Sequence, residues 1–511
     1  MRSLGYAAFT CMKTFLALFA CSVTLASGQL LRCPLAVEWE TSLGGPQSEQ
    51  VNNVHQLADG GYIVGGGGVG FWAARLNAQG SVLWFKRYSS TSGVQAFDLQ
   101  PTADGGFILG GGSSVGGGNR TAPLYGDYDF WIIRLDGDGN QLWDRSFGGS
   151  GFDFIYGLQQ TTDGGYILGG ISTSPPSGNK TSAPFGSYDF WVVRCDAGGN
   201  KLWDRSYGGT GREFWGRARQ TADGGFVMIG TTDSGANGNK STPSFGGDDA
   251  WIVRLDADGN KLWDQTVGGT AYEYLGEVVE MPAGGFITAG WSQSAPGGNK
   301  TSPLFGGNDG WVICLNANGL LRWEQSFGGN DLDLLVGVAK TSDGGYIAAG
   351  QAAAGVSGNK FSEAGGAWLV RLDPVGNKLW DHGTGLSPVP IAVKQTSDGG
   401  FVLAGDAFSA ETSSNGWALK LGPEGENCDS DGDGVPDVQD QCPNTRPGDV
   451  VNAQGCSIAQ PCPCHGPWKN HGEYLRCIQQ TSAQFEQLGL ITAKQRRAIM
   501  RAARHSDCGK R

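Results

Sequence analysis

The sequence predicts an all-β protein whose main part is a seven-bladed β-propeller. Seven units of similar sequence follow one another between positions 37 and 420, and in the middle their Gly-Gly turns recur about every 60 residues. The 511-residue chain contains 87 glycines and only 17% charged residues, which is typical of short strands joined by many tight turns. Regular repetition of short strands at such a period is the pattern of propeller blades.

Each unit is predicted to contain four strands that pair in order. In the third unit they span 154–160, 166–171, 190–195 and 202–206. Asp163-Gly164-Gly165 joins the first two strands, and a turn like that at 256–260 of the fourth unit joins the last two. Both turns supply the positive backbone angles that short hairpins need. We therefore expect four-stranded meanders whose first strands line a central channel.

The two ends of the repeat predict how the ring closes. The last tryptophan of a third strand is Trp417, and no fourth strand follows it, whereas Trp39 resembles a fourth-strand tryptophan but precedes the first unit. Residues 37–42 are therefore expected to complete the seventh blade and to remove the exposed edges of an open array. Cys33 and Cys428 flank this junction, so a disulfide between them is expected to fasten the closure.

Residues 1–28 are predicted to form a secretory signal peptide. Arg2 and Lys13 precede or flank an apolar run at 14–25, and small residues at Ala26 and Gly28 suit cleavage. The mature chain is therefore expected outside the cell or at the cell surface. An alternative is a lipid anchor at Cys21, because residues 18–21 read as a loose lipobox. No other apolar run is long enough to predict a transmembrane segment.

The net charge limits the possible binding partners, and the cysteine content indicates the cellular compartment. The formal net charge is −12, and acid is concentrated in the propeller and at 429–440, so a phosphate backbone would be repelled and nucleic acid is excluded as a partner. Eight cysteines lie at Cys33 or beyond position 424, which predicts disulfides in an oxidising compartment. Cys195 and Cys314 lie in third strands of different blades and are expected to be buried free thiols.

One candidate ligand site is a rim of the ring. The connections between second and third strands carry Gly-Asn-Lys sequences, and acidic residues recur where one blade follows another. Two interpretations stay open: these groups form a polar platform on one face, or they hold neighbouring blades together. The basic candidates are Lys180, Lys240 and Lys300, and the acidic positions are Asp153, Glu213, Glu273 and Asp333.

A second candidate site is the channel. The first strands of the fourth and fifth units carry Trp215, Arg217, Arg219 and Glu277, which the other units do not repeat, so they break the symmetry of the ring where a ligand could enter. Catalysis has little support, because the propeller contains only two histidines, in different blades, and no recognisable hydrolase or phosphate-binding motif.

Residues 429–440, Asp-Ser-Asp-Gly-Asp-Gly-Val-Pro-Asp-Val-Gln-Asp, carry the sharpest chemical signal. Carboxylates at alternate positions converge when the chain curls, glycine permits the curl, and such hard oxygen ligands favour Ca²⁺. An EF-hand would have Glu at the twelfth position and flanking helices, whereas here Asp440 is followed directly by Gln-Cys-Pro. The sequence predicts a calcium site that is not an EF-hand.

This stretch, with Asp440-Gln-Cys-Pro-Asn-Thr and Val450-Val-Asn-Ala-Gln-Gly-Cys456 after it, closely resembles a thrombospondin type 3 repeat of bacterial envelope and secreted proteins. The resemblance covers 428–458. It implies a disulfide between Cys442 and Cys456, and a module that acts as a rigid calcium-dependent spacer. The calcium ligands that it implies are Asp429, Asp431, Asp433, Asp437 and Asp440, with the carbonyl oxygen of Val435.

The last part, 459–511, is predicted to be a small helical domain. One helix spans about 473–488 and ends at Gly489, and Thr492 with Gln495 forms the capping box of a second helix that reaches about 505. Two disulfides within one set of four cysteines would staple the pair of helices, with the pairing left open. That set is Cys462, Cys464, Cys477 and Cys508. The alternative is a zinc site that uses Cys462, Cys464, His465 and His471.

These observations predict four segments: 1–28, a propeller at 33–427, the type 3 repeat and the helical domain. The propeller units also resemble those of secreted bacterial proteins rich in Asp-Gly-Gly-Tyr/Phe. We expect a non-enzymatic, calcium-binding protein that serves adhesion or binds an extracellular glycan or protein through its rim loops. The alternative is a polysaccharide-acting hydrolase or lyase with its site in the channel, which convergence of Arg217, Arg219 and Glu277 would favour.

Overall fold

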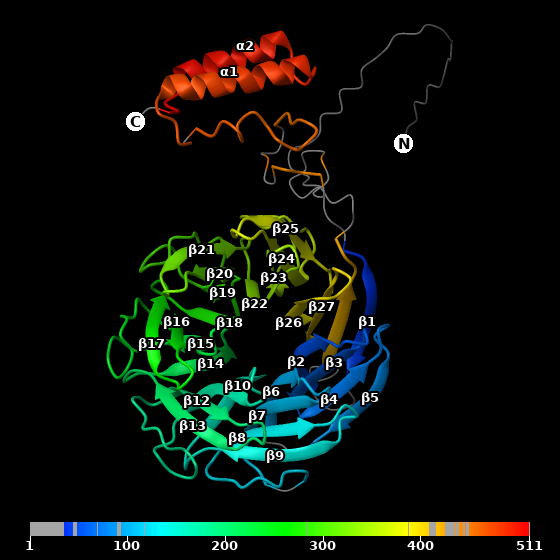
Figure 1. Cartoon of the computed structure of the whole chain (residues 1–511), viewed down its shortest axis with the longest axis vertical. Coiled ribbons are helices and arrows are strands. Elements are labelled where there is room, and N and C mark those ends of the chain that lie inside the picture. Colours follow the sequence, from blue (N-terminus) through cyan, green and yellow to red (C-terminus); the bar gives the residue numbers. More distant parts are fainter. Residues whose placement is uncertain are drawn as a thin grey trace, which may run out of the picture.

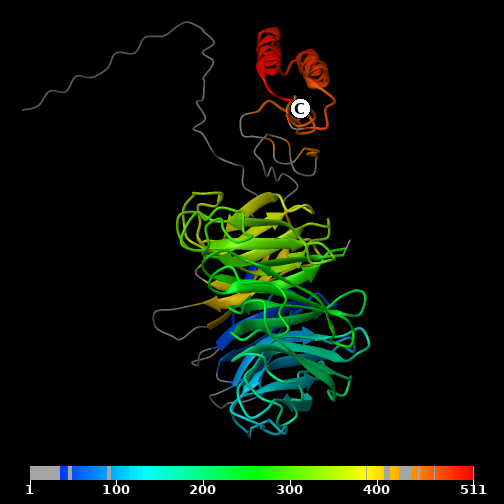
Figure 2. The same ribbon diagram turned by 90° about the vertical axis from the view of Figure 1, so that its left-hand side faces the viewer.

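The computed structural model describes residues 35–43, 49–68, 70–88, 94–116, 118–282, 284–386, 388–407, 415–424, 435, 439–442, 445, 449–464 and 466–509. Seven four-stranded antiparallel sheets form a closed ring (Figure 1), which confirms the seven-bladed β-propeller. In the side view the helices lie next to one another and apart from the ring (Figure 2).

The innermost strands of the blades are β2 (Glu49–Gln56), β6 (Val94–Pro101), β10 (Asp153–Gln160), β14 (Glu213–Gln220), β18 (Glu273–Glu280), β22 (Asp333–Lys340) and β26 (Val389–Gln395). The second strands are β3 (Tyr62–Gly68), β7 (Phe107–Ser113), β11 (Tyr166–Ser172), β15 (Phe226–Thr232), β19 (Phe286–Ser292), β23 (Tyr346–Ala352) and β27 (Phe401–Ala407).

The third strands are β4 (Trp72–Leu76), β8 (Asp129–Leu135), β12 (Asp189–Cys195), β16 (Asp249–Leu255), β20 (Asp309–Leu315), β24 (Gly366–Leu372) and β28 (Asn415–Leu421). The outer strands are β5 (Val82–Arg87), β9 (Gln141–Phe147), β13 (Lys201–Tyr207), β17 (Lys261–Val267), β21 (Leu321–Phe327), β25 (Lys378–Gly383) and, in the seventh blade, β1 (Val37–Leu43).

The turn between the first two strands explains the repeated Asp-Gly-Gly sequence. In the third blade Gly164 has a φ of 84°, which glycine adopts without a steric penalty. The carboxylate of Asp163 accepts hydrogen bonds from the hydroxyl of Thr161 at 2.6 Å and from the amide of Gly165 at 3.1 Å. It also forms an ion pair with Arg194 of the third strand at 2.5 Å. The turn is thereby fixed to the middle of its own sheet.

The tryptophans of the third strands form the core between blades. Each of the seven is at most 1% exposed. A phenylalanine that precedes one tryptophan packs on the tryptophan of the next blade: the ring centroids of Phe130 and Trp191 lie 4.5 Å apart, and those of Phe190 and Trp251 lie 5.0 Å apart. Such aromatic pairs bury large apolar surface and set the spacing of neighbouring sheets.

The N-terminal strand closes the ring, as the sequence predicts. Strand β1 pairs with β28 in the antiparallel direction, with Ser42 opposite Trp417 and Trp39 opposite Lys420. The indole nitrogen of Trp417 donates a 2.8 Å hydrogen bond to Glu40. Blade seven therefore takes its outer strand from the start of the chain. The predicted disulfide between positions 33 and 428 lies outside the described residues.

Asparagines of the Gly-Asn-Lys sequences hold neighbouring blades together. The side-chain amide of Asn239, in the fourth blade, accepts from the amide of Gly208 at 2.9 Å and donates to the carbonyl of Ser206 at 3.0 Å, both in the third. The same pair of bonds recurs at Asn179, Asn299 and Asn359. The repeated asparagine is thus a structural tie.

The C-terminal part is a disulfide-linked pair of helices, α1 (His471–Gln487) and α2 (Ala493–His505). Asn470 caps α1, and the predicted capping box of Thr492 and Gln495 begins α2. Three disulfides are present: Cys442 with Cys456, Cys462 with Cys477, and Cys464 with Cys508. The alternative zinc site is wrong, because both of its cysteines are in disulfides and provide no thiolate.

Cys195 and Cys314 are buried free thiols, as predicted. Burial raises the pKa of the Cys195 thiol, and burial likewise raises that of Cys314 to about 11, so neither is poised to react.

Candidate functional site

Every innermost strand carries a β-bulge where it passes the centre of the ring. The pairing register with the second strand shifts in all seven blades. A bulge bends the strand and re-aims the side chain next to it. The seven residues that directly follow the shift are Asn53, Asp98, Gly157, Arg217, Glu277, Gly337 and Ala392. Four of these are polar, and they come from blades one, two, four and five.

Arg219 joins the acids of this set. Its guanidinium donates to both carboxylate oxygens of Glu277, at 3.1 Å and 2.7 Å, and lies 3.2 Å from Asp98. The three residues come from β14, β18 and β6, so one ion-pair network spans blades two, four and five. Two of the residues predicted from the sequence, Arg219 and Glu277, are therefore brought together in the channel. We call Asn53, His55, Asp98, Arg217, Arg219, Glu277 and Lys394 the channel cluster.

Asp98 is fully occupied by donors. It accepts from the side-chain amides of Asn53 at 2.6 Å and Gln100 at 2.9 Å, and from the backbone amide of Leu158 at 3.0 Å, in addition to Arg219. A carboxylate with this many donors is held rigidly. Asp98 therefore positions Arg219 within the channel.

Glu277 is an anion at every physiological pH. Burial alone would raise its pKa, but the charges of Arg219, Lys394 and Arg217 and the bidentate bond to Arg219 hold it at about 2. A carboxyl with so low a pKa is a poor proton donor or acceptor near neutral pH. Its role in this geometry is to fix Arg219.

The remaining members of the cluster carry unused polar atoms. The Nε2 atom of His55 and the Nε atom of Arg217 are buried and have no hydrogen-bond partner among the described residues. Burial, with the charges of Lys394 and Arg219, lowers the pKa of His55 to about 3, so the imidazole is neutral. Burial also lowers the pKa of Lys394, although Glu277 acts in the opposite direction.

An arc of aromatic rings lies beside the cluster, near the start of the innermost strands. Ring centroids lie 5.1 Å apart between Phe97 and Tyr156, 4.9 Å between Tyr156 and Trp215, and 5.6 Å between Trp215 and Tyr274. Trp291 stacks on Tyr274 at 5.8 Å. We call these five residues the aromatic arc. It runs continuously from blade two to blade five.

Trp215 is the exposed member of the arc, with 38% of its surface accessible. Its φ is 61°, the one positive value that a residue other than glycine has in the described part of the chain. A bulky side chain in the left-handed region is strained, and such strain persists where the surrounding structure imposes it, often at ligand sites. Arg217 and Arg219 follow on the same strand, so the ring and the charges share one scaffold.

The predicted rim lysines are not surface groups. Lys180, Lys240 and Lys300 are 3%, 3% and 2% exposed. Lys180 donates to the carbonyl of Ser182 at 2.5 Å and to the hydroxyl of Ser206 at 3.1 Å, and Lys300 makes the equivalent bonds in its own blade. The interpretation of these lysines as a polar platform is therefore wrong, because each ammonium group donates its hydrogen bonds within its own blade.

The acids at the blade junctions are internal as well. Glu213 of β14 lies beside Asp189 of β12, and both carboxylates would contact a methyl group added at Gly208. Burial, with the nearby charge of Asp189, raises the pKa of Glu213 to about 7. At the junction of blades two and three, burial raises the pKa of Asp129 to about 6, with Asp153 adding to the shift. These pairs are structural.

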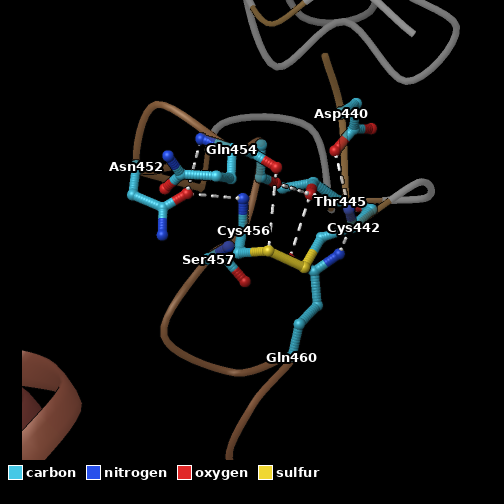
Figure 3. The surroundings of a disulfide bond; sticks show 9 residues. Asp440, Cys442, Thr445, Asn452, Gln454, Cys456, Ser457 and Gln460 are labelled. Carbon is cyan, nitrogen blue, oxygen red and sulfur yellow. Dashed lines mark hydrogen bonds between the residues drawn. A yellow bond between two sulfur atoms is a disulfide. The ribbon is translucent and has the colours of Figure 1, made fainter. Parts of the chain in front are cut away.

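Most of the predicted calcium ligands, at positions 429, 431, 433 and 437, lie outside the described residues. In Figure 3, Asp440 accepts a 2.8 Å hydrogen bond from the amide of Cys442, next to the disulfide with Cys456. Asn452 accepts from the amides of Gln454 and Cys456, both at 3.0 Å. In the described part of the chain, no group of three or more His, Cys, Asp and Glu is placed to hold a metal ion.

Part of the channel cluster was not predicted from the sequence. Asn53, Asp98 and Lys394 lie in innermost strands, but each was hidden in a unit that departs from the repeat. An alignment of the seven strands on the bulge would have found Asn53 and Asp98, because three other blades have Gly157, Gly337 and Ala392 at this position. Lys394 lies two residues after the bulge position of its own strand. A separate hollow of about 1110 Å³ in the C-terminal domain, lined by residues such as Ile458, Ile478 and Ile499, belongs to a different part of the chain.

Comparison with known proteins adds little about function. No protein-family model matches the chain, and no curated protein is similar to it. The WD40 domain of Neurospora crassa Pan2 is 10% identical over 76% of this chain and 96% of its own, with a TM-score of 0.44. A streptogramin B lyase is 11% identical over 75% and 97%, also with a TM-score of 0.44. Similarities at this level carry no argument about the site.

A protein of unknown function from Bacteroides caccae is 12% identical over 53% of this chain and 78% of its own, with a TM-score of 0.32. None of the described helices has the length and apolar character needed to span a membrane.

Proposed function

We propose that this is an exported, calcium-binding protein that binds an extracellular glycan at the mouth of the propeller channel. The observation that carries the proposal is Trp215. Its ring is exposed, its backbone is held in a left-handed conformation, and it packs against Tyr156 and Tyr274. A flat apolar ring beside fixed polar groups suits a sugar, which offers an apolar face and hydroxyl groups together.

The proposed site is the channel, the second of the two candidate sites in the sequence, and not the rim loops through which we expected binding. The rim lysines form their hydrogen bonds within their own blades, whereas in the described part of the chain the channel contains buried polar atoms without partners near exposed Trp215. Recognition by one asymmetric site explains why only blades one, two, four, five and seven contribute to the channel cluster. A role in adhesion follows if the glycan belongs to another surface.

Calcium binding is proposed for residues 429–440, which follow the propeller. Five carboxylates within twelve residues repel one another unless a cation lies among them, and hard oxygen donors select Ca²⁺. The Cys442–Cys456 bridge agrees with the pairing that a type 3 repeat implies. Three disulfides suit an oxidising compartment and hence export. Calorimetric titration with Ca²⁺ tests this part, with Asp433→Asn expected to weaken binding.

The alternative is a polysaccharide-acting enzyme with its site in the channel. The convergence of Arg219 and Glu277 is the observation that favours it. However, the pKa of Glu277 is about 2 and that of His55 is about 3, so neither is matched to proton transfer near neutral pH. Release of new reducing ends or of unsaturated sugars from a polysaccharide panel would establish the enzyme instead.

A glycan array probed with the mature full-length chain tests the proposal. Trp215→Ala is expected to lower binding roughly tenfold or more, since exposed aromatic anchors dominate such sites. The matched control is Tyr272→Ala, which removes another exposed aromatic ring, 52% accessible, from the start of blade five outside the aromatic arc. Equal loss in both variants, or no binding by the unmodified chain, would contradict the proposal. Binding that ignores a calcium chelator would separate the tail from recognition.

A further inference from the structure

Two basic residues of the channel cluster, Arg217 and Lys394, have no carboxylate partner among the described residues. Among the residues that the structure describes, Arg219 takes up both carboxylates, Glu277 through a bidentate bond and Asp98 at 3.2 Å. Arg217 forms no hydrogen bond or ion pair there, and its Nε atom is buried without a partner. Lys394 has neither within bonding distance in the described part of the chain, although it lies close enough to Glu277 and Arg217 to feel their charges.

The excess of positive charge is local and goes against the rest of the molecule. The cluster contains three basic residues and two acids, and its histidine is neutral, whereas the whole chain has a formal net charge of −12. A buried guanidinium without a partner lowers the stability of the fold, and arginine does not avoid this cost by deprotonation. Among the described residues, no third acid joins the cluster.

We infer that the glycan is acidic, and that its carboxylate or sulfate group binds Arg217, with Lys394 on the other side of the channel as the second cation. This inference rests on the proposed function. Trp215 lies two residues before Arg217 on β14, so the sugar ring can lie on the indole while its anion reaches the guanidinium. An anion beside Lys394 also opposes the lowering of its pKa by burial.

A glycine of the neighbouring blade, Gly157, leaves room for this arrangement. Gly157 of blade three faces Arg217 and Arg219, and a methyl group added there would lie 3.2 Å from the Cβ atom of Arg217 and 3.1 Å from the Nη1 atom of Arg219. Blade three therefore has no side chain at the position of Asp98 in blade two, and the Cβ atom of Arg217 and the guanidinium of Arg219 lie close to this glycine. An acid at this position would have neutralised Arg217 from within the protein.

Titration calorimetry of the mature full-length chain tests the inference with three oligosaccharide sets of matched length: neutral glucans, uronates and sulfated glucans. We expect an acidic set to bind about tenfold or more tightly than the neutral set, since one charge-assisted hydrogen bond supplies that difference. Its affinity should fall as salt is added. The tighter of the two acidic sets identifies the anion.

Neutral glucans that bind as tightly as both acidic sets would overturn the inference and leave the proposed function intact. Absence of binding by all three sets would overturn both. In the variants, Arg217→Gln should lose about tenfold in affinity for the acidic set and nothing for the neutral set. Lys394→Gln should act in the same direction, which keeps the test open if one variant does not fold.

The matched control is Lys340→Gln, which removes a positive charge from the exposed end of innermost strand β22, outside the cluster. It is expected to bind as the unmodified chain does. An equal loss in Lys340→Gln would mean that net charge alone steers the ligand, and the assignment to Arg217 would be wrong.

Discussion

The indole nitrogen of Trp417 donates a 2.8 Å hydrogen bond to the carboxylate of Glu40, a residue 377 positions earlier in the chain. In the third blade the equivalent tryptophan, Trp191, donates to Asp204 of its own outer strand at 3.1 Å. Glu40 therefore accepts the same hydrogen bond in the seventh blade that an outer-strand acid accepts in blades two to five. The closure of the ring reproduces both the backbone pairing and the side-chain contact of an ordinary blade.

Substitution of Glu40 tests this closure. Glu40→Ala leaves the buried indole N–H of Trp417 without an acceptor and is expected to lower the free energy of unfolding by about 1 kcal/mol. Glu40→Gln keeps an acceptor and should be nearly neutral. Urea denaturation followed by tryptophan fluorescence measures both. Equal stability of the alanine variant and the unmodified chain would contradict the role of β1 as a full outer strand.

The positive φ of Trp215 predicts the relative stability of glycine and alanine at this position. In an ordinary strand glycine is less stable than alanine by roughly 0.5–1 kcal/mol, but at a positive φ alanine is the strained residue by about 1 kcal/mol. Trp215→Gly should therefore be more stable than Trp215→Ala, and both should lose glycan binding. Thermal unfolding of the two variants gives the order. The reverse order would show that Trp215 is not held in the left-handed region.

The acid pairs predict how stability varies with pH. Folding raises the pKa of Asp129 to about 6 and that of Glu213 to about 7, chiefly by burial. Their contribution to stability is therefore complete below the unfolded pKa values of about 4 and is lost as pH rises through about 6 to 7. Asp309, with a pKa raised to about 6 by burial, adds to this, whereas His55, with its lowered pKa, acts in the opposite direction.

Because several carboxyls oppose one imidazole, the urea midpoint of the mature chain should fall between about pH 5 and pH 7. Asp129→Asn removes one charge of a pair and should make the dependence shallower. His55→Asn should make it steeper. A midpoint that rises with pH over this range would mean that the pairs are ionised in the folded protein and held by some other group.

The positions of the disulfides predict that a reductant unfolds the C-terminal helices and leaves the propeller folded. The Cys464–Cys508 bridge closes a loop of 44 residues, for which chain entropy gives at most about 4 kcal/mol. Reduction should therefore melt α1 and α2 and abolish the helical circular dichroism signal. The propeller should persist, because its described cysteines, Cys195 and Cys314, are unbonded and buried. Loss of the ring transition under reductant would contradict this separation.

Much of the fold was predictable because the repeat itself encodes it. Gly164 and its equivalents mark turns, the tryptophans mark third strands, and the odd position of Trp39 reveals the closure. Regular patterns of this kind depend on local chemistry and on counting. The helix boundaries near Thr492 were equally accessible, since a capping box is a local signal.

The site was less predictable because it depends on burial and on distance across the ring. The sequence presents Lys180 as a charged loop residue, but the loop folds over it and surrounds the ammonium group with hydroxyls and carbonyls. Asp98 and Arg219 are 121 positions apart, and only the curvature of the ring brings them within 3.2 Å. The asymmetric cluster forms from blades whose innermost strands depart from the repeated sequence, and these departures show no pattern in the sequence alone.

A crystal structure of the mature chain with a bound acidic oligosaccharide would show whether the mouth of the channel is the glycan site. We expect a sugar ring against the indole of Trp215, with its carboxylate or sulfate within hydrogen-bond distance of Arg217. A sugar bound on the outer loops of the ring, with the channel mouth free, would contradict it.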